Sequence, residues 1–168
     1  MTTPERTRLP FDPIEEAARQ WGNHWDEMPR MRAVTSLMRV HQLVLTELDE
    51  LLRPLGLTFA RYEVLVLLSF SRRGALPLGK IGERLQVHAT SVTPLVKRLE
   101  AADLIKRTPH PEDGRAVLAS ITPSGRMVMD RATDLIVGAR FALGALSDDE
   151  CDRLTRLLTS PRKAAGDF

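Results

Sequence analysis

Cysteine is nearly absent from this sequence of 168 residues, which contains a single one at position 151. Cys151 alone cannot form an intrachain disulfide, and no Cys/His cluster has the spacing of zinc ligands. A packed or half-exposed thiol is the ordinary interpretation of Cys151, and a redox-sensing thiol is the alternative that no other feature favours. The sequence therefore indicates neither a disulfide scaffold nor a zinc site.

Long hydrophobic runs are also missing. No stretch approaches the roughly 18 consecutive apolar residues that a membrane-spanning helix needs. The first 13 residues are polar and interrupted by proline, so they lack the apolar block of a secretory signal. We therefore expect a cytoplasmic protein, associated with the nucleoid if it binds DNA, and no membrane partner.

Motifs of the common enzyme classes are missing as well. The sequence has no Walker loop, no G-x-S-x-G and no H-E-x-x-H. Gly79 to Gly82 imitates the G-x-x-G loop of KH domains, but helix is predicted on both sides of it. His110, Glu112 and Asp113 resemble a metal-ligand set, but a hairpin tip is a poor scaffold for one. We expect no enzyme, no cofactor and no metal.

The net charge of +2 hides an uneven distribution. Acidic residues gather near both ends, at 15–27 and at 148–150. The middle is basic, through Arg72, Arg73, Lys80, Arg84, Lys97, Arg98, Lys106, Arg107 and Arg115. A basic middle between mixed ends suggests one surface that faces a polyanion.

Helical periodicity dominates the pattern of apolar residues. It predicts helices at about 12–27, 31–52, 58–70, 78–85, 89–103, 122–143 and 148–159. Thr58 and Thr122 are placed to cap two of them, and Ser147 to Glu150 has capping-box spacing. The run at 64–68 is apolar nearly all round, which predicts a central buried helix.

Two short strand-like runs at 105–108 and 116–121 flank Asp113-Gly114, which is a hairpin signal. Two short helices followed by a hairpin form a winged helix-turn-helix. We therefore expect a mainly α fold with a small β-wing and helices on both sides of it. The expected segments are a disordered N-terminus, N-terminal helices, the winged lobe, C-terminal helices and a tail, at 1–10, 11–56, 57–121, 122–160 and 161–168.

The helix at 89–103 has two different faces. At 100° per residue, Val92, Leu95, Val96 and Leu99 share one face. The outward side and its flanks carry the candidate DNA contacts Thr90, Ser91, Thr93, Pro94, Lys97 and Arg98. Small side chains permit close approach to a major groove, and hydroxyl and cationic groups reach base edges or phosphates. The alternative is a simply solvated face.

Proline at position 94 conflicts with a regular helix. It costs about 3 kcal/mol relative to alanine and removes a hydrogen bond. We expect either a tolerated kink or a helix whose regular part starts later. On the outward face, the ring of Pro94 is placed to contact a thymine methyl group.

The hairpin adds a second group of candidate DNA contacts. Arg115 can enter a minor groove, whose negative potential attracts guanidinium. Asp113 either orients Arg115 through a carboxylate–guanidinium hydrogen bond or is a plain turn residue. Lys106 and Arg107 are expected beside the phosphate backbone.

The ordered stretches LGLTFARYEVLVLL (55–68) and LGKIGERLQVHATSVTPLVKRLEAADLIKRTPHPEDGRAVLASITPSGR (78–126), with the helical tail, resemble the MarR family of bacterial regulators. The resemblance covers about residues 31–160. It implies a homodimer joined by the N- and C-terminal helices, which binds a near-palindromic site in double-stranded DNA, usually as a repressor relieved by a small molecule. The alternative is a winged-helix module that binds proteins without direct DNA readout.

The resemblance also implies an effector site where the dimerisation helices meet the DNA-binding lobe. The candidates for it are Trp21, Trp25, Arg39, His41, Arg61 and Tyr62. Aromatic rings beside arginine suit a small aromatic or carboxylate effector, through stacking and bidentate bonding. The alternative for the tryptophans is the core of the dimer interface, and for His41 a hydrogen-bonded core histidine.

Overall fold

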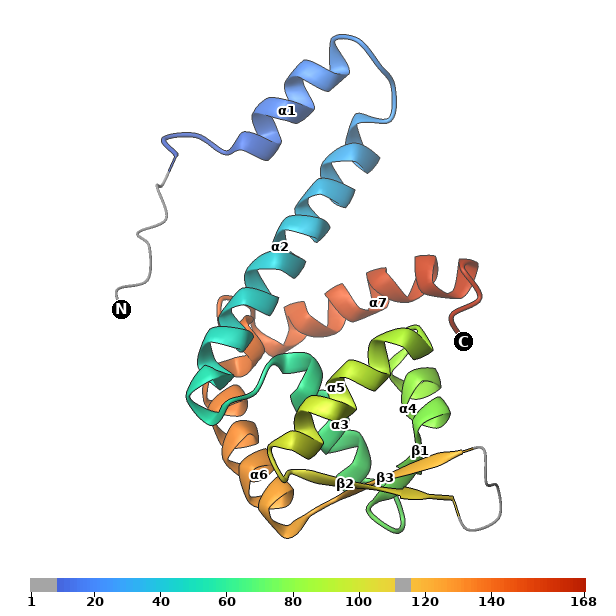
Figure 1. Cartoon of the computed structure of the whole chain (residues 1–168). Coiled ribbons are helices and arrows are strands. Elements are labelled where there is room, and N and C mark those ends of the chain that lie inside the picture. Colours follow the sequence, from blue (N-terminus) through green and yellow to red (C-terminus); the bar gives the residue numbers. More distant parts are fainter. Residues whose placement is uncertain (1–8, 111–115) are drawn as a thin grey trace. The chain divides into compact units, whose positions relative to one another are not determined.

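The computed structural model describes residues 9–110 and 116–168 (Figure 1). Most of the N-terminus that was expected to be disordered lies outside these residues, and so do Asp113 and Arg115. The chain forms two compact units, Met1–Thr46 and Glu47–Phe168, and each is described by itself. No helix in the described ranges is long and apolar enough to cross a bilayer.

The first unit is a pair of helices, α1 (Pro13–Gly22) and the greater part of α2 (Met28–Leu52). Asp12 caps α1, because its Oδ1 accepts a hydrogen bond of 2.8 Å from the amide of Ile14. Helix α1 ends five residues before the predicted end at 27, and α2 begins three residues before the predicted start at 31. Residues 23–27 form the turn that joins the two helices.

The second unit contains the helix-turn-helix and the wing. Its elements in chain order are η1 (Arg53–Leu55), α3 (Phe59–Ser69), β1 (Ala75–Pro77), α4 (Leu78–Leu85), α5 (Ala89–Ala101), β2 (Ile105–Pro109) and β3 (Val117–Ile121). The strands form an antiparallel sheet in the order β1-β3-β2, with Ile105 opposite Ile121. The predicted fold class is confirmed, and β1 is a short strand that the pattern did not predict.

Helix α3 forms the centre of the second unit, as its apolar run predicts. Val64, Leu65 and Leu68 are fully buried, and α3 packs against α4, α5, the sheet and a later helix, α6 (Pro123–Gly138). The predicted capping by the Thr58 side chain is wrong. The amide of Phe59 instead donates to Oδ1 of Asp49 at 2.7 Å, so a carboxylate from α2 caps this helix.

The C-terminal part contains α6, η2 (Arg140–Ala142) and α7 (Asp148–Ala164). Both predicted caps are confirmed: Thr122 Oγ1 accepts from the amide of Gly125, and Ser147 and Glu150 form a capping box. The helix that was predicted to reach 143 ends at Gly138, and Phe141 in the following η2 takes a left-handed φ of 54°. Helix α7 continues through Pro161, so the expected tail at 161–168 begins with ordered helix.

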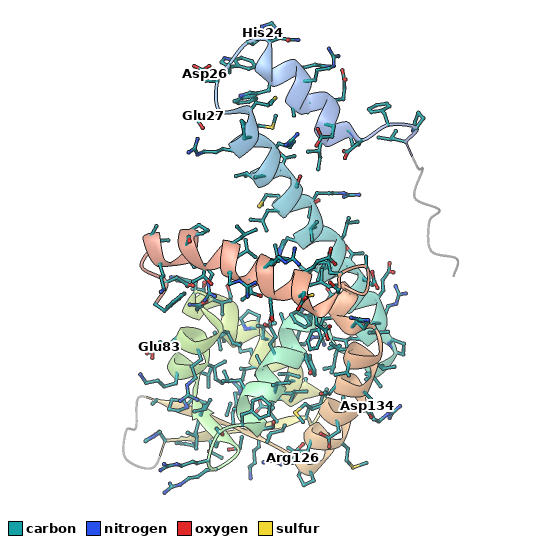
Figure 2. All side chains as sticks on the ribbon, turned by 180° about the vertical axis from the view of Figure 1, so that it is seen from behind. His24, Asp26, Glu27, Glu83, Arg126 and Asp134 are labelled. Atoms are coloured by element: carbon teal, nitrogen blue, oxygen red, sulfur yellow. The ribbon has the colours of Figure 1, made fainter. Side chains whose placement is uncertain are left out.

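The start of α6 is fitted closely to the turn before β1. Arg126, labelled in Figure 2, lies against Gly74, where a Cβ atom would come within 2.5 Å of the arginine Nη2. Gly74 also has a left-handed φ of 62°, and its carbonyl accepts from the amide of Ile121 at 2.9 Å. The left-handed φ is what requires glycine at this turn, because the Arg126 side chain could move away from a Cβ atom.

Candidate nucleic-acid interface

Helix α5 presents the two faces that its sequence predicts. Val92, Val96 and Leu99 are buried against the rest of the second unit, and Leu95 is half-buried. The predicted contact residues Thr90, Ser91, Thr93, Pro94, Lys97 and Arg98 are all exposed. The helix therefore offers solvent a continuous face of hydroxyl, cationic and small side chains, of the kind that can enter a major groove.

The N-terminus of α5 is held by a residue that lies between the predicted helices at 78–85 and 89–103. His88 is the N-cap, and its Nδ1 accepts from the amide of Thr90 at 3.3 Å. The same Nδ1 lies 2.7 Å from Oγ1 of Thr90. Histidine is not among the preferred capping residues, so only its position before the helix could have indicated this role. Thr90 is thereby oriented by its neighbour.

Pro94 lies inside a helix that begins at Ala89, so the expectation of a later start is wrong. A proline here cannot donate a hydrogen bond to the carbonyl of Thr90, and its ring crowds that carbonyl. Its ring is exposed on the outward side of the helix, where no buried neighbour has to accommodate it. The role of Pro94 in base contact stays a prediction.

Strand β2 continues the cationic surface from α5. Lys106 is exposed, whereas Arg107 is half-buried and paired with Glu100 of α5. Arg107 Nε donates to Oε2 of Glu100 at 2.6 Å, and the Arg107 amide donates to Oε1 at 3.3 Å. The Arg107 hydrogen bond lowers the pKa of Glu100 and raises that of Arg107. Arg107 thus holds the wing against α5, a role that its charge alone did not indicate.

Among the described residues, the cationic groups next to this pair have no comparable partner. Within residues 9–110 and 116–168, no acidic side chain pairs with Lys97, Arg98 or Lys106. Cations left unpaired on one surface are free to neutralise phosphates. The predicted partners at the tip of the wing, Asp113 and Arg115, lie outside the described residues.

A second basic cluster lies where α3 is followed by β1 and α4. Arg72, Arg73 and Arg84 line a hollow of about 410 Å³ together with Phe70, whose side chain is 84% exposed. In the described part of the chain, none of the three arginines has an acidic partner. The charge pattern indicated these arginines as part of the basic middle, but it did not single them out as a site.

The six effector candidates are divided between the two units. Trp21, Trp25, Arg39 and His41 belong to the first unit, and Arg61 and Tyr62 to the second. Trp21 and Trp25 are in contact at the α1–α2 turn, with ring centroids 4.9 Å apart and ring planes tilted by 48°, and Trp21 Nε1 donates to the carbonyl of Asp26. The two tryptophans therefore have a structural role in this turn.

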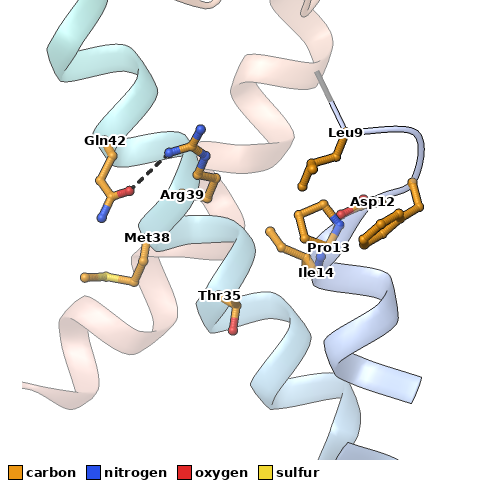
Figure 3. A pocket seen from close by; sticks show the side chains of 9 residues that line it. Leu9, Asp12, Pro13, Ile14, Thr35, Met38, Arg39 and Gln42 are labelled. Atoms are coloured by element: carbon orange, nitrogen blue, oxygen red, sulfur yellow. Dashed lines mark hydrogen bonds between the residues drawn. The ribbon is translucent and has the colours of Figure 1, made fainter. Parts of the chain in front are cut away.

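The remaining candidates have different surroundings. The Arg61 guanidinium donates to the carbonyl of Gly56 at 2.8 Å, and the hydroxyl of Tyr62 lies 3.0 Å from Oγ1 of Thr133. Both side chains thus fasten α3 to its neighbours. The side chain of His41 is exposed, so the first unit by itself does not bury it as a core histidine. Arg39 lines a groove between the start of α1 and the middle of α2 (Figure 3).

In residues 9–110 and 116–168, the other reactive side chains form no recognisable catalytic or metal centre. Cys151 is half-buried in α7. Among the described residues, no three His, Cys, Asp or Glu side chains gather in the way that metal ligands do. The arrangement that combines exposure, charge and rigid support is therefore the outward face of α5 with β2.

Comparison with known proteins identifies the family. The MarR family model matches residues 57–117, which run from the start of the lobe to β3. A solved structure of a MarR family transcriptional regulator from Streptomyces coelicolor is 50% identical, with a TM-score of 0.78 over 83% of this chain and 97% of that one. The transcriptional repressor MdtR from Bacillus subtilis is 34% identical over 132 residues, 77% of this chain and 83% of the relative.

This chain belongs to the MarR family of transcriptional regulators. A structure of mutant MarR from E. coli complexed with operator DNA is 25% identical, with a TM-score of 0.69 over 80% of this chain and 96% of that one. The resemblance inferred from the sequence is therefore confirmed. The similarity to the solved structure from Streptomyces coelicolor covers 83% of this chain, and it therefore extends beyond residues 57–117, which the family model matches.

Proposed function

We propose that this MarR-family regulator is a repressor that binds operator DNA as a homodimer, in the cytoplasm at the nucleoid. The observation that carries the proposal is the exposed face of α5, whose cations have no acidic partner among the described residues. The operator complex of MarR from E. coli and the name of the repressor MdtR support it. Regulation would proceed by binding alone, without catalysis or a cofactor.

The side chains of the interface have different roles. Ser91 and Thr93 are small enough to approach base edges in the major groove, while Lys97 and Arg98 reach bases or phosphates. Lys106 contacts the phosphate backbone of the DNA beside α5. Arg107 positions the wing, from which Arg115 is proposed to reach the minor groove while Asp113 orients the Arg115 guanidinium. Phosphate contacts set affinity and register, and base contacts set specificity.

Unburied apolar faces support the homodimer. None of the 17 residues of α7 is buried, and Leu157 on this helix is 73% exposed. In the first unit, α2 exposes Val34, Leu37 and Leu45 at helical spacing. Faces of this kind are covered when two copies associate through the same surface. The N- and C-terminal helices are accordingly proposed as the dimer interface.

Selection of bound duplexes from a random pool tests this function. A dimer with one α5 in each major groove requires two inverted half-sites whose centres lie about 10 base pairs apart. We expect the selected sequences to show this symmetry, and a footprint to cover both half-sites. A single isolated half-site, or no enrichment over the input pool, would contradict the proposal.

A further inference from the structure

The segment that follows α7 lies beside the turn between α4 and α5, and all of these elements belong to the second unit (Figure 1). Gln86, the C-cap residue of α4, donates from Nε2 to Oδ1 of Asp167 and also, at 3.3 Å, to the Asp167 carbonyl. The two residues are 81 positions apart in the sequence. The fold therefore brings the end of the C-terminal helix to the turn of the helix-turn-helix.

Asp167 is held in place by the end of its own helix. Gly166 takes a left-handed φ of 70° after α7 and turns the chain back. The Gly166 amide donates to the carbonyl of Lys163 at 3.0 Å, and the Asp167 amide donates to that of Arg162 at 3.1 Å, which is the pattern of a Schellman motif. Arg162 Nε also donates to Oδ2 of Asp167 at 2.5 Å. One carboxylate oxygen of Asp167 is thus bound to α7 and the other to the end of α4.

Phe168 attaches the same segment to α7 a second time. Its ring centroid lies 4.9 Å from Cζ of Arg162 and 5.7 Å from Nζ of Lys163, within the range of cation–π contacts. The Asp167 side chain is only 25% exposed. The carboxylate that reaches Gln86 is therefore fixed on several sides and partly shielded from water.

The turn that Asp167 contacts leads directly into α5. Gln86 itself has a left-handed φ of 55°, a conformation that residues other than glycine rarely adopt. Two residues later, His88 caps α5 by accepting from the amide of Thr90. An anchored Gln86 side chain favours the unusual backbone from which α5 starts, because surrounding contacts must hold such a conformation.

We propose that Asp167 is a positioning residue for DNA binding. The contact between Gln86 and Asp167, called the clasp below, holds the α4–α5 turn and thereby orients Thr90 and Ser91 in the first turn of α5. The effect on operator affinity rests on the proposed function, whereas the hold on the turn does not. Since α7 also belongs to the proposed dimer interface, the clasp connects that interface to the start of α5.

The sign of the change in operator affinity separates positioning from simple charge. An acidic side chain beside a DNA-binding helix repels phosphates, so removal of its charge alone would strengthen binding. We expect Asp167→Ala to weaken binding by about three- to tenfold instead, because a charge-assisted hydrogen bond to the turn is lost. Fluorescence anisotropy with the full-length protein and a labelled operator duplex measures this.

Three further variants complete the affinity test. Gln86→Ala should cause a similar loss, and the double variant with Asp167→Ala should lose no more than either one, because both remove the same contact. Asp167→Asn keeps an oxygen that can accept from Gln86 and should bind more tightly than Asp167→Ala. Asp152→Ala is the matched control, since it removes another exposed acidic side chain of α7, and it should leave affinity unchanged or slightly raised.

Hydrogen exchange without DNA tests the clasp separately from DNA binding. The amides of Val87, Thr90 and Ser91 donate within the turn and the cap, and in Asp167→Ala we expect them to exchange at least about threefold faster. The amide of Gly125, at the start of α6, is the internal reference and should keep its rate.

Unchanged exchange at the turn, additive losses in the double variant, no recovery in Asp167→Asn, or tighter operator binding by Asp167→Ala would overturn the proposal. A native protein that binds no operator would refute the proposed function. The exchange rates would in that case still decide whether the clasp holds the turn.

Discussion

The guanidinium of Arg107 holds the carboxylate of Glu100, with Nε 2.6 Å from Oε2, and joins the first strand of the wing to the last turn of α5. The amide of Arg107 donates to the other carboxylate oxygen. Lys97 on α5 lies three residues before Glu100, and Lys106 on β2 is next to Arg107. The bridge therefore fixes the spacing between the two groups of proposed DNA contacts.

Breaking the bridge from either end should weaken DNA binding. We expect Glu100→Gln and Arg107→Gln each to lower operator affinity by about tenfold, because the wing loses its fixed position relative to α5. Fluorescence anisotropy with a labelled operator duplex measures this, and sedimentation checks that the dimer is retained. If Arg107 served only as a phosphate contact, Glu100→Gln would free it and strengthen binding, which would contradict the positioning role.

The same bridge predicts a pH dependence. The hydrogen bond from Arg107 lowers the folded-state pKa of Glu100 below its ordinary value of 4.5. The bridge therefore contributes its full stabilisation above pH 4.5, and the contribution is lost as the pH falls through the lowered pKa. A carbon-detected NMR titration should give a lower midpoint for Glu100 in the native protein than in Arg107→Gln. Equal midpoints would show that the bridge does not persist in solution.

Gly125 should be intolerant of any side chain. A Cβ atom there would lie 2.0 Å from the carbonyl oxygen of Leu104, which already accepts from the amide and hydroxyl of Thr122. We expect Gly125→Ala to lower the free energy of unfolding by about 1–3 kcal/mol, because the start of α6 must move away. Urea unfolding measures the loss.

Gly79→Ala is the matched control for this substitution. Gly79 is exposed on α4, and a Cβ atom there would meet nothing within 4 Å. It should leave stability unchanged or raise it by up to about 1 kcal/mol, because alanine favours helix. Similar losses in both variants would mean that the close approach to Leu104 does not decide the effect.

The dimer interface is tested at the exposed stripe of α2. Leu37 is 44% exposed within its unit, and we expect Leu37→Glu to weaken dimerisation by 100-fold or more, roughly the cost of burying unpaired charge. Sedimentation velocity measures the monomer fraction. Phe70→Glu removes an exposed apolar side chain from the DNA-binding lobe and should leave the dimer intact. A dimer that survives Leu37→Glu would place the interface elsewhere.

Features that depend on near neighbours in the chain could be predicted from the sequence. The two faces of α5 follow from helical spacing, and the caps at Thr122 and Ser147 act within three residues. The capping of α3 could not be predicted, because Asp49 lies ten residues before Phe59 and reaches it only through the fold. Strand β1 has three residues, too few for an alternation to be recognised.

In the candidate site, too, some features follow from neighbouring residues in the chain and others depend on the fold. Exposure of Lys97 and Arg98 follows from periodicity, whereas the pairing of Arg107 depends on the packing of β2 against α5. From the sequence alone, a paired arginine and a free one look alike. The groove at Arg39 also escaped prediction in its full extent, because its lining combines the segment before α1 with the middle of α2.

The salt dependence of operator binding tests the central claim most directly. Each phosphate contact contributes about 0.9 to the slope of log affinity against log salt concentration. Lys97→Gln/Arg98→Gln removes four cations from a dimer, so we expect a steep slope for the native protein and one shallower by roughly 3 to 4 in the variant. Arg30→Gln, in the first unit, should leave the slope unchanged. A flat slope for the native protein, or an unchanged one in the double variant, would contradict DNA binding through α5.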